Sequence, residues 1–186
     1  MPVAIALLRA VNLGPHHRIK MDTLRSICET LGGRDVETIL QSGNAIFKVP
    51  QRSLSTLGAR LELAIEAELG FRPRVITRST PEMRQAVVQN PFAARKDINP
   101  SHLLVTFLAD HPAQECREKV IAMRTEPEEL HLVGRELYMY FPNGMARPKT
   151  SWMTVEKALK VAGTGRNWNV VQKLLETAER LEAGRD

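Results

Sequence analysis

Hydrophobic residues in the first part of the chain recur with two spacings, and the order of these spacings predicts the fold. Val3–Leu8 is an unbroken run of apolar residues that favours a strand. From Met21 to Leu31 the apolar residues recur every three or four positions, which is typical of an amphipathic helix. Two further apolar runs, at 36–40 and 45–49, flank the turn residues Ser42-Gly43-Asn44 and predict a hairpin.

The next segments complete this first unit and lead out of it. The spacing of leucines predicts a helix over 54–69, and residues 74–77 read as a fourth strand. The resulting order of strand, helix, strand, strand, helix, strand is that of the split βαβ or ferredoxin-like fold. Residues 80–90 then predict a connecting helix, because Thr80 and Pro81 are suited to a helix start and Asn90-Pro91 to its end.

The second part of the chain begins the same pattern again. It predicts a strand over 102–108, a helix over 113–123, a hairpin of 129–133 with 136–141, and helices over 153–161 and 167–181. We therefore expect an α+β fold of two ferredoxin-like (split βαβ) lobes in tandem, with a helical linker and C-terminal helices. The expected divisions are an N-terminal ferredoxin-like lobe at 1–79, the linker at 80–99 and a C-terminal α+β lobe at 100–186.

Composition narrows the classes of protein without indicating a reaction. The 186 residues are 43% hydrophobic and 25% charged, as in ordinary globular proteins. No apolar run approaches the roughly 20 residues of a membrane span, so no membrane partner is expected. Cys28 and Cys116 are isolated from each other, which fits a reducing compartment, and the N-terminus lacks the pattern of a signal peptide. We therefore expect a cytoplasmic protein.

Motifs for catalysis, metals and cofactors are missing from the sequence. It contains no phosphate-binding loop of the NTPase type, no zinc-binding helix motif and no nucleophile elbow. No catalytic residue, metal ligand or cofactor is therefore predicted, and whether the protein is an enzyme stays open. A module that stacks RNA bases is disfavoured because the first strand has no aromatic residue and the third has only Phe47.

The predicted topology brings three polar stretches to one end of the first lobe. The first and second strands run in the same direction, so loop 9–20 and turn 41–44 meet, and connection 70–73 joins them. Their side chains are mostly hydrogen-bond donors: Arg9, Asn12, His16, His17, Arg18, Lys20, Gln41, Ser42, Asn44 and Arg72. With the N-terminus of the helix that starts near Met21, they favour an anion site. The alternative is that these are ordinary solvated loop ends.

A second polar cluster lies at 164–173, near the predicted start of the last helix. Thr164 or Asn167 would cap this helix. Arg166 at the positive end of a helix is unfavourable unless an anion or an acid accompanies it. Trp168 either packs into the core or contributes to a site. Asn169 and Lys173 complete the cluster, and Lys149 adds positive charge nearby in the sequence.

Several of these segments together resemble the bacterial domain of unknown function 1697 family. The resemblance covers residues 7–12, 19–25, 41–47, Asn90-Pro91-Phe92 and 164–169 with Lys173, in the order of the family. It implies a cytoplasmic bacterial protein with a two-lobed α+β fold and no established activity. The chain departs from the family pattern at Ala10 and Pro15, where glycine is usual, at Ile39 in place of an aromatic residue, and at Pro148-Lys149 in place of a Ser-Lys pair. If the family binds phosphate in the first loop, these changes would weaken it here.

Three hypotheses about function follow. The first is a binding protein whose basic polar rim takes a phosphate-bearing small molecule or a nucleic-acid backbone. The second is an enzyme that acts on a small phosphorylated metabolite between the lobes. The third is a homodimer formed through a free sheet edge, without a ligand. The candidate ligand-binding residues are Arg9, Asn12, Lys20, Gln41, Ser42, Asn44, Lys149, Arg166, Asn167, Trp168, Asn169 and Lys173.

Overall fold

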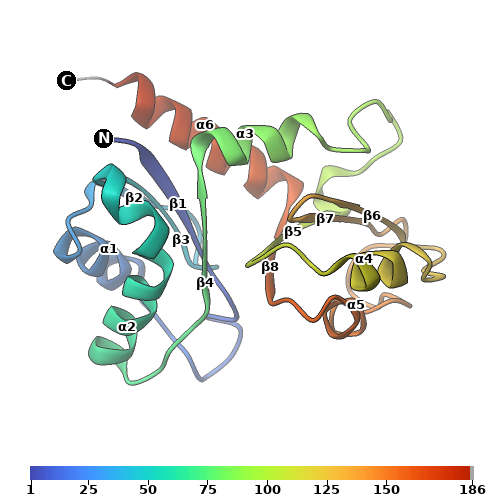
Figure 1. The fold of residues 1–186 in the computed structure, drawn as a ribbon, viewed down its shortest axis with the longest axis horizontal. Coiled ribbons are helices and arrows are strands. Elements are labelled where there is room, and N and C mark those ends of the chain that lie inside the picture. Colours follow the sequence, from blue (N-terminus) through green and yellow to red (C-terminus); the bar gives the residue numbers. More distant parts are fainter. Residues whose placement is uncertain (185–186) are drawn as a thin grey trace. The chain divides into compact units, whose positions relative to one another are not determined.

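The computed structural model describes residues 1–184 and contains two four-stranded sheets with their helices (Figure 1). The first set of elements is β1 (Val3–Leu8), α1 (Met21–Thr30), β2 (Arg34–Thr38), β3 (Asn44–Lys48), a 3-10 turn (Gln51–Thr56), α2 (Leu57–Leu69) and β4 (Val75–Ser79). The helix α3 (Thr80–Val88) follows. The second set is a 3-10 turn (Pro100–His102), β5 (Leu103–Leu108), α4 (Gln114–Ile121), β6 (Glu129–Val133), β7 (Glu136–Tyr140), α5 (Trp152–Leu159), β8 (Gly163–Asn167) and α6 (Trp168–Ala183).

Both sheets have the ferredoxin-like strand order. The first is β2-β3-β1-β4 and the second is β6-β7-β5-β8, and all neighbouring strands are antiparallel. The registers also correspond, because Ile5 of β1 pairs with Arg78 of β4 and Val105 of β5 pairs with Arg166 of β8. The predicted α+β fold with two such lobes is confirmed.

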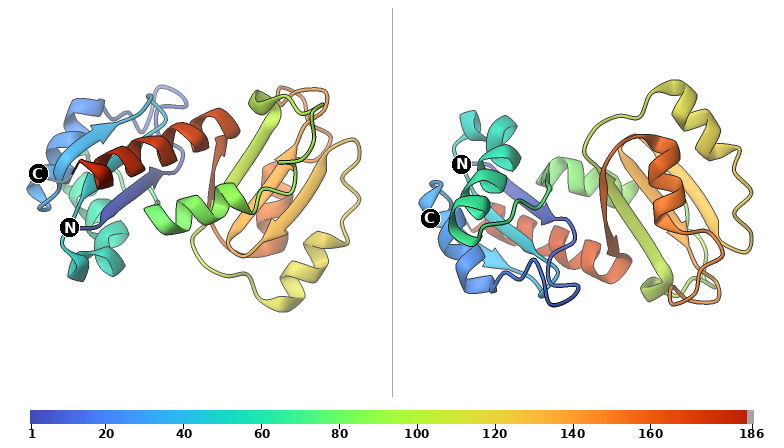
Figure 2. Two further views of the ribbon diagram at one scale, coloured as in Figure 1. Left: turned by 90° about the horizontal axis from the view of Figure 1, so that it is seen from above. Right: turned by 90° about the horizontal axis from the view of Figure 1, so that it is seen from below.

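The chain forms two compact units, and their boundaries fall within helices. Unit 1 contains Met1–Arg84 and the segment that begins at Lys173, and unit 2 contains Gln85–Gln172. The C-terminal part of α6, from Lys173 onward, therefore belongs to unit 1, whereas the sequence-based division places it in the second lobe. Within unit 1 this part of α6 lies along β2 and β3, where Arg180 donates to Glu37 at 2.7 Å and Lys48 donates to the carbonyl of Gly184 at 3.1 Å (Figure 2).

The core of unit 1 explains why β1 reads as an unbroken apolar run. All six residues of β1 are buried, so both faces of this central strand are covered. Ala4, Ala6 and Leu8 belong to the core cluster that also contains Leu24 of α1 and Leu61 of α2. In unit 2 a corresponding cluster joins Leu108, Met139 and Val155 from β5, β7 and α5.

Two sequence-based elements need correction. The helix expected over 54–69 is a 3-10 turn over Gln51–Thr56 followed by α2 from Leu57. The segment Gly163–Asn167, expected to be the approach to a helix, is the strand β8. The sequence does not indicate a strand here, because two of the five residues are glycine and none is aliphatic. A Cβ at Gly163 would lie 2.7 Å from Thr106 Cγ2, and one at Gly165 would lie 3.0 Å from Leu104 Cδ1, so a side chain at either position would crowd the neighbouring strand β5.

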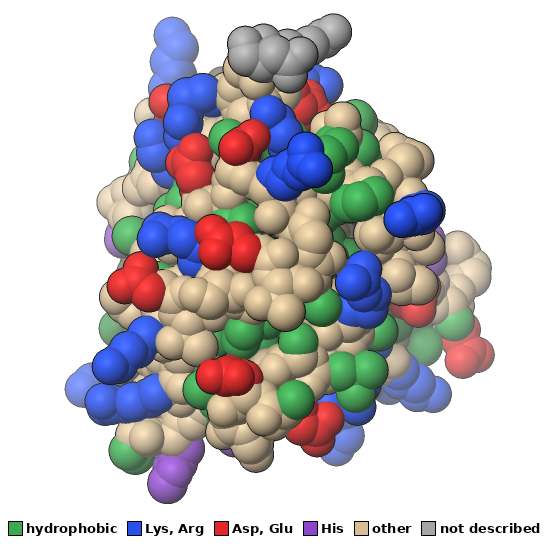
Figure 3. Space-filling view, turned by 90° about the vertical axis from the view of Figure 1, so that its left-hand side faces the viewer, with side chains coloured by type: hydrophobic (Ala, Val, Ile, Leu, Met, Phe, Trp, Pro, Cys, Tyr) green, Lys and Arg blue, Asp and Glu red, His purple; other side chains and the backbone are tan. Residues whose placement is uncertain are grey.

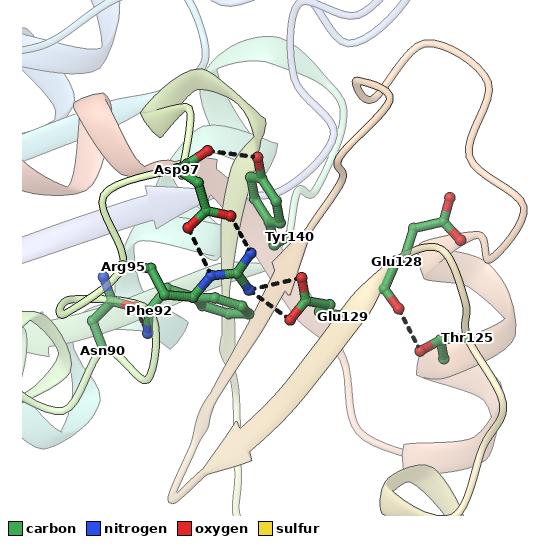
Figure 4. A network of polar contacts seen from close by, with 8 residues as sticks. All are labelled: Asn90, Phe92, Arg95, Asp97, Thr125, Glu128, Glu129 and Tyr140. Atoms are coloured by element: carbon green, nitrogen blue, oxygen red, sulfur yellow. Dashed lines mark hydrogen bonds and ion pairs between the residues drawn. The ribbon is translucent and has the colours of Figure 1, made fainter.

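The motif Asn90-Pro91-Phe92 has a structural explanation within unit 2 (Figure 4). The Asn90 side chain accepts a hydrogen bond from the backbone N–H of Phe92 at 3.0 Å, which forms a tight turn. The buried Phe92 ring then packs against Tyr140, with centroids 5.9 Å apart. The Arg95 guanidinium contacts both Asp97 and Glu129 at 2.7 Å or less, and Arg95 holds the pKa of the Asp97 carboxyl below its usual range. This network fastens residues 90–97 to β6 and β7.

Cys28 provides a test of the core of unit 1. Burial raises the pKa of its thiol to about 12, so the reactive thiolate is suppressed in the folded protein. We expect Cys28 to resist alkylation at pH 8 and to react once urea unfolds the chain. Because the thiol ionises at a lower pH in the unfolded chain, the contribution of Cys28 to stability is fully present below pH ~9 and is lost as the pH rises toward the pKa of the folded protein. Peptide mass spectrometry after timed iodoacetamide labelling measures the rate; a native rate equal to the unfolded rate would contradict the expected burial.

Candidate functional site

The side chain of Asn12 closes the loop of residues 9–20 in unit 1. Its Nδ2 donates to the carbonyls of Ile19 at 3.0 Å and Gln41 at 2.7 Å, and its Oδ1 accepts from the Ile19 N–H at 3.0 Å. Its own backbone N–H donates to the carbonyl of His17 at 3.1 Å. One asparagine thus fixes both ends of the loop and ties them to the β2–β3 turn. Asn12 positions the site, because its amide is occupied by the chain itself.

The turn 41–44 and the segment 70–74 meet the same loop. The Leu8 N–H donates to the Gly43 carbonyl at 2.8 Å, and the Arg9 N–H donates to the Arg74 carbonyl at 2.9 Å. The rings of His17 and Phe71 stack with centroids 5.0 Å apart. The predicted convergence of loop 9–20, turn 41–44 and connection 70–73 is therefore confirmed, together with the strand directions on which it depends.

A cavity of about 630 Å³ opens at this meeting point, and we call it the loop cavity. Its size suits a small molecule, since ligand pockets occupy about 300–1,000 Å³. Its lining joins the loop, the start of α1, the β2–β3 turn and the end of α2: Asn12, Gly14, Arg18, Ile19, Lys20, Thr23, Gln41 and Leu69. The lining contains two basic residues and no acidic one.

The electrostatics around the loop cavity favour a negative ligand. Arg18 and Lys20 are both exposed, and Lys20 has no ion-pair partner within the described part of the chain. Lys20 also precedes the first turn of α1, and no side chain caps the N–H groups there. Asp22, the acid of that first turn, is paired with Arg25 at 3.2 Å. In the face drawn in Figure 3, basic side chains gather beside a histidine at the lower left.

Other predicted residues of this rim are held within the protein. Asn44 is fully buried, and its amide donates to the Ile39 carbonyl at 2.7 Å and to the Ser42 hydroxyl at 3.0 Å. These bonds stabilise the turn, so we leave Ser42 and Asn44 out of the ligand contacts proposed below. Arg9 is half-buried beside Arg74. Arg72 lies 3.5 Å from the buried carboxylate of Glu62, which compensates its charge.

Sequence reasoning placed Arg18 on the polar rim but did not include it among the candidate ligand-binding residues, and it did not single out Thr23 at all. Arg18 follows two histidines in a loop, and Thr23 occupies one of the polar positions of an amphipathic helix. Their convergence depends on how Asn12 folds the loop. The same loop requires left-handed backbone at Ala10, with φ 54°, which glycine adopts without steric cost. The glycine that the family resemblance implies at this position would therefore be free of that strain.

In the structure, the second predicted cluster, at 164–173, is divided between the strand β8 and the helix α6. The boundary between the two units also crosses it, because Lys173 belongs to unit 1. Arg166 is buried, donates to the Thr164 hydroxyl at 2.8 Å and to the Gly165 carbonyl at 2.9 Å, and has its pKa lowered to about 10 by burial. Asn167 caps α6 by accepting from the Val170 N–H at 3.0 Å, as its position predicted. Arg166 therefore lies in a strand and not in the first turn of a helix.

The remaining candidate residues differ in their surroundings. In unit 2, Trp168 is half-buried and Asn169 is exposed at the start of α6. Lys149 is exposed, and its backbone N–H donates to the buried carboxylate of Glu128 at 3.0 Å. In unit 1, Lys173 forms an exposed ion pair with Glu176 at 3.0 Å.

Among residues 1–184, no group of three or more His, Cys, Asp or Glu side chains is arranged to hold a metal ion. In the same residues, no helix combines the length and apolar character needed to cross a membrane.

Comparison with known proteins places the chain in a family. The family profile described as "Protein of unknown function (DUF1697)" matches residues 1–138. The solved structure of the conserved bacterial protein SP0830 from Streptococcus pneumoniae is similar, with a TM-score of 0.67 at 19% identity, over 96% of this chain and 99% of that chain. This likeness shows the fold alone. No curated protein matches the chain. Because the family profile covers most of the sequence, this protein belongs to the DUF1697 family of proteins of unknown function.

Proposed function

We propose that unit 1 binds a phosphate-bearing small molecule in the loop cavity. Arg18 and Lys20 supply the positive charge, and the side chains of Thr23 and Gln41 supply directional hydrogen bonds. A guanidinium and an ammonium with several donors each are well suited to the oxygens of a phosphate group. The backbone N–H groups at the start of α1 add further donors. Asn12 keeps these groups together and makes no direct contact.

The observation that carries this proposal is the charge of the lining. The loop cavity has two bases, three uncharged polar side chains and no acid around a volume of about 630 Å³. A cation would meet no carboxylate there, whereas an anion would find partners on several sides. A bounded cavity also favours a small molecule over a nucleic-acid backbone, which needs an extended basic surface. Phe47, the aromatic residue of β3, is fully buried in the core cluster shared with α1 and α2.

A thermal-shift series tests the proposal directly. Inorganic phosphate, glycerol phosphate and a short oligonucleotide are each added to the full chain at low ionic strength. We expect the phosphate compounds to raise Tm, because a ligand present at 100 times its Kd stabilises the folded state by about 2.7 kcal/mol. Added sodium chloride should reduce the shift by screening the charges. If only the oligonucleotide raises Tm, the site binds nucleic acid and not a small molecule. If no compound raises Tm, the proposal is wrong.

A further inference from the structure

Two leucines beside the loop cavity are exposed to an unusual degree. Leu13 is 83% exposed and Leu40 is 60% exposed. Leu13 stands between Asn12 and Gly14, and Leu40 precedes Gln41; all three of these neighbours line the cavity. The hydrogen bond from Asn12 to the Gln41 carbonyl, at 2.7 Å, joins the two segments. Two exposed leucines thus directly adjoin, along the chain, residues that line the cavity with the bases Arg18 and Lys20.

Leu40 is unfavourable in two independent ways. Its side chain faces water, and its backbone has φ 57°, in the left-handed region that β-carbon-bearing residues other than Asn and Asp rarely adopt. An asparagine or glycine would adopt this backbone conformation more readily and would expose no aliphatic side chain to water. A residue that breaks two local rules at the mouth of a cavity is more readily explained by a ligand than by folding.

Apolar surface also continues inward from the mouth. Ile19, which is 2% exposed, and Leu69, which is half-buried, contribute to the wall between the polar groups. No aromatic side chain is present in this lining, and the rings of His17 and Phe71, in loop 9–20 and connection 70–73, stack on each other. The apolar part of the wall thus suits a flexible aliphatic group, whereas a nucleobase would lack a stacking partner.

We infer that the ligand of the loop cavity is an amphiphile, a phosphate monoester that carries an aliphatic chain. The inference rests on the proposed function, since the phosphate is held by Arg18 and Lys20 as above. The chain would leave the cavity past Ile19 and Leu69 and cover Leu13 and Leu40. Two leucines are too small a surface for a stable protein interface, which buries about 800 Å² per partner. They are enough to lie along a short alkyl chain.

A homologous series of alkyl phosphates separates the two claims. The affinities of inorganic phosphate and of methyl, butyl and hexyl phosphate are measured by isothermal titration calorimetry with the full chain. Partial burial of each methylene should tighten binding about twofold, so hexyl phosphate should bind about 30-fold more tightly than methyl phosphate. Equal affinities along the series would overturn the inference while leaving the phosphate site intact. If inorganic phosphate and methyl phosphate both fail to bind, the proposed function itself fails.

Variants link the chain-length effect to the two leucines. The double variant Leu13→Ser with Leu40→Asn keeps a residue at 40 that tolerates the left-handed backbone. It should bind inorganic phosphate as before and lose most of the dependence on chain length. Leu63→Ser changes another exposed leucine, which lies on α2 and is 52% exposed, and should keep that dependence. A double variant that retains the full dependence, or adenosine monophosphate binding more tightly than hexyl phosphate, would overturn the inference.

Binding to vesicles identifies the source of the ligand. Co-sedimentation with phosphatidylcholine vesicles that contain phosphatidic acid reports on a membrane-borne phosphate monoester with aliphatic chains. Binding to these vesicles, with loss in the Leu13→Ser, Leu40→Asn variant, supports the inference for a lipid ligand. Binding of hexyl phosphate without binding of the vesicles supports it for a soluble ligand. Vesicle binding that the double variant retains in full would contradict the role of the leucines.

Discussion

Gly43→Ala is expected to lower the free energy of unfolding of unit 1 by about 3–4 kcal/mol, the largest effect of any single methyl group considered for the site. Gly43 has φ 75°, so alanine is strained there irrespective of space. The added Cβ would also lie 2.6 Å from Val11 Cγ2 and 2.8 Å from Leu8 Cβ. These atoms belong to a packed core and cannot withdraw without opening the contact between β1 and the turn.

Gly70→Ala is the matched control for this effect. Gly70 has φ 74°, nearly that of Gly43, but nothing lies within 4 Å of a Cβ placed there. Only the conformational strain remains, so the expected cost is about 1 kcal/mol. Urea denaturation should be followed by far-UV circular dichroism, because Trp152 and Trp168 both lie in unit 2 and report on that unit. Equal losses of unfolding free energy in the two variants would show that the contacts with Leu8 and Val11 add nothing to the cost of Gly43→Ala.

Neutralising the two bases of the loop cavity is expected to weaken phosphate binding strongly. Lys20→Gln should weaken the affinity about tenfold, and the double change Arg18→Gln with Lys20→Gln about 100-fold, since each charged hydrogen bond contributes about 1.5–3 kcal/mol. Both side chains are exposed and lie outside the core, so the Tm without ligand should change little. Calorimetric titration with inorganic phosphate at low salt gives the affinities.

Arg84→Gln provides the matched control for charge. Arg84 is an exposed base of unit 1 that pairs with Glu179 at 2.9 Å, and it does not line the loop cavity. Its removal lowers the net charge by the same amount as Lys20→Gln. Phosphate affinity should stay within twofold of that of the unmodified protein. A tenfold loss in Arg84→Gln would show that net charge, and not the loop cavity, governs the binding.

The elements whose burial follows a local periodicity could be predicted from the sequence. β1 and α1 were predictable because an apolar run and a helical stripe directly record burial. The convergence of loop 9–20 with turn 41–44 was predictable from the strand order alone. β8 was not, because Gly163 and Gly165 reflect close contacts with Thr106 and Leu104 across the sheet, which no local pattern reveals.

The site was predicted in location more accurately than in detail. Asn12 and Asn44 were expected to contact a ligand because asparagine is a versatile hydrogen-bonding residue. In the structure both amides bind the backbone of neighbouring segments, and this depends on how the loop and the turn fold. Arg18 and Thr23 line the loop cavity for the same reason. The loop conformation, including the left-handed residues Ala10 and Asn12, decides which side chains face the opening.

The return of the chain to unit 1 through α6 has a consequence for biosynthesis. Arg180 and Lys48 make the contacts that join this helix to β2 and β3. A nascent chain that has emerged only as far as Arg84 holds every strand of the first sheet and lacks the helix that binds two of them. Unit 2 is complete earlier, although it begins later. Unit 1 therefore gains its full set of contacts only after the segment that begins at Lys173 has been synthesised, which couples its folding to residues far away in the sequence.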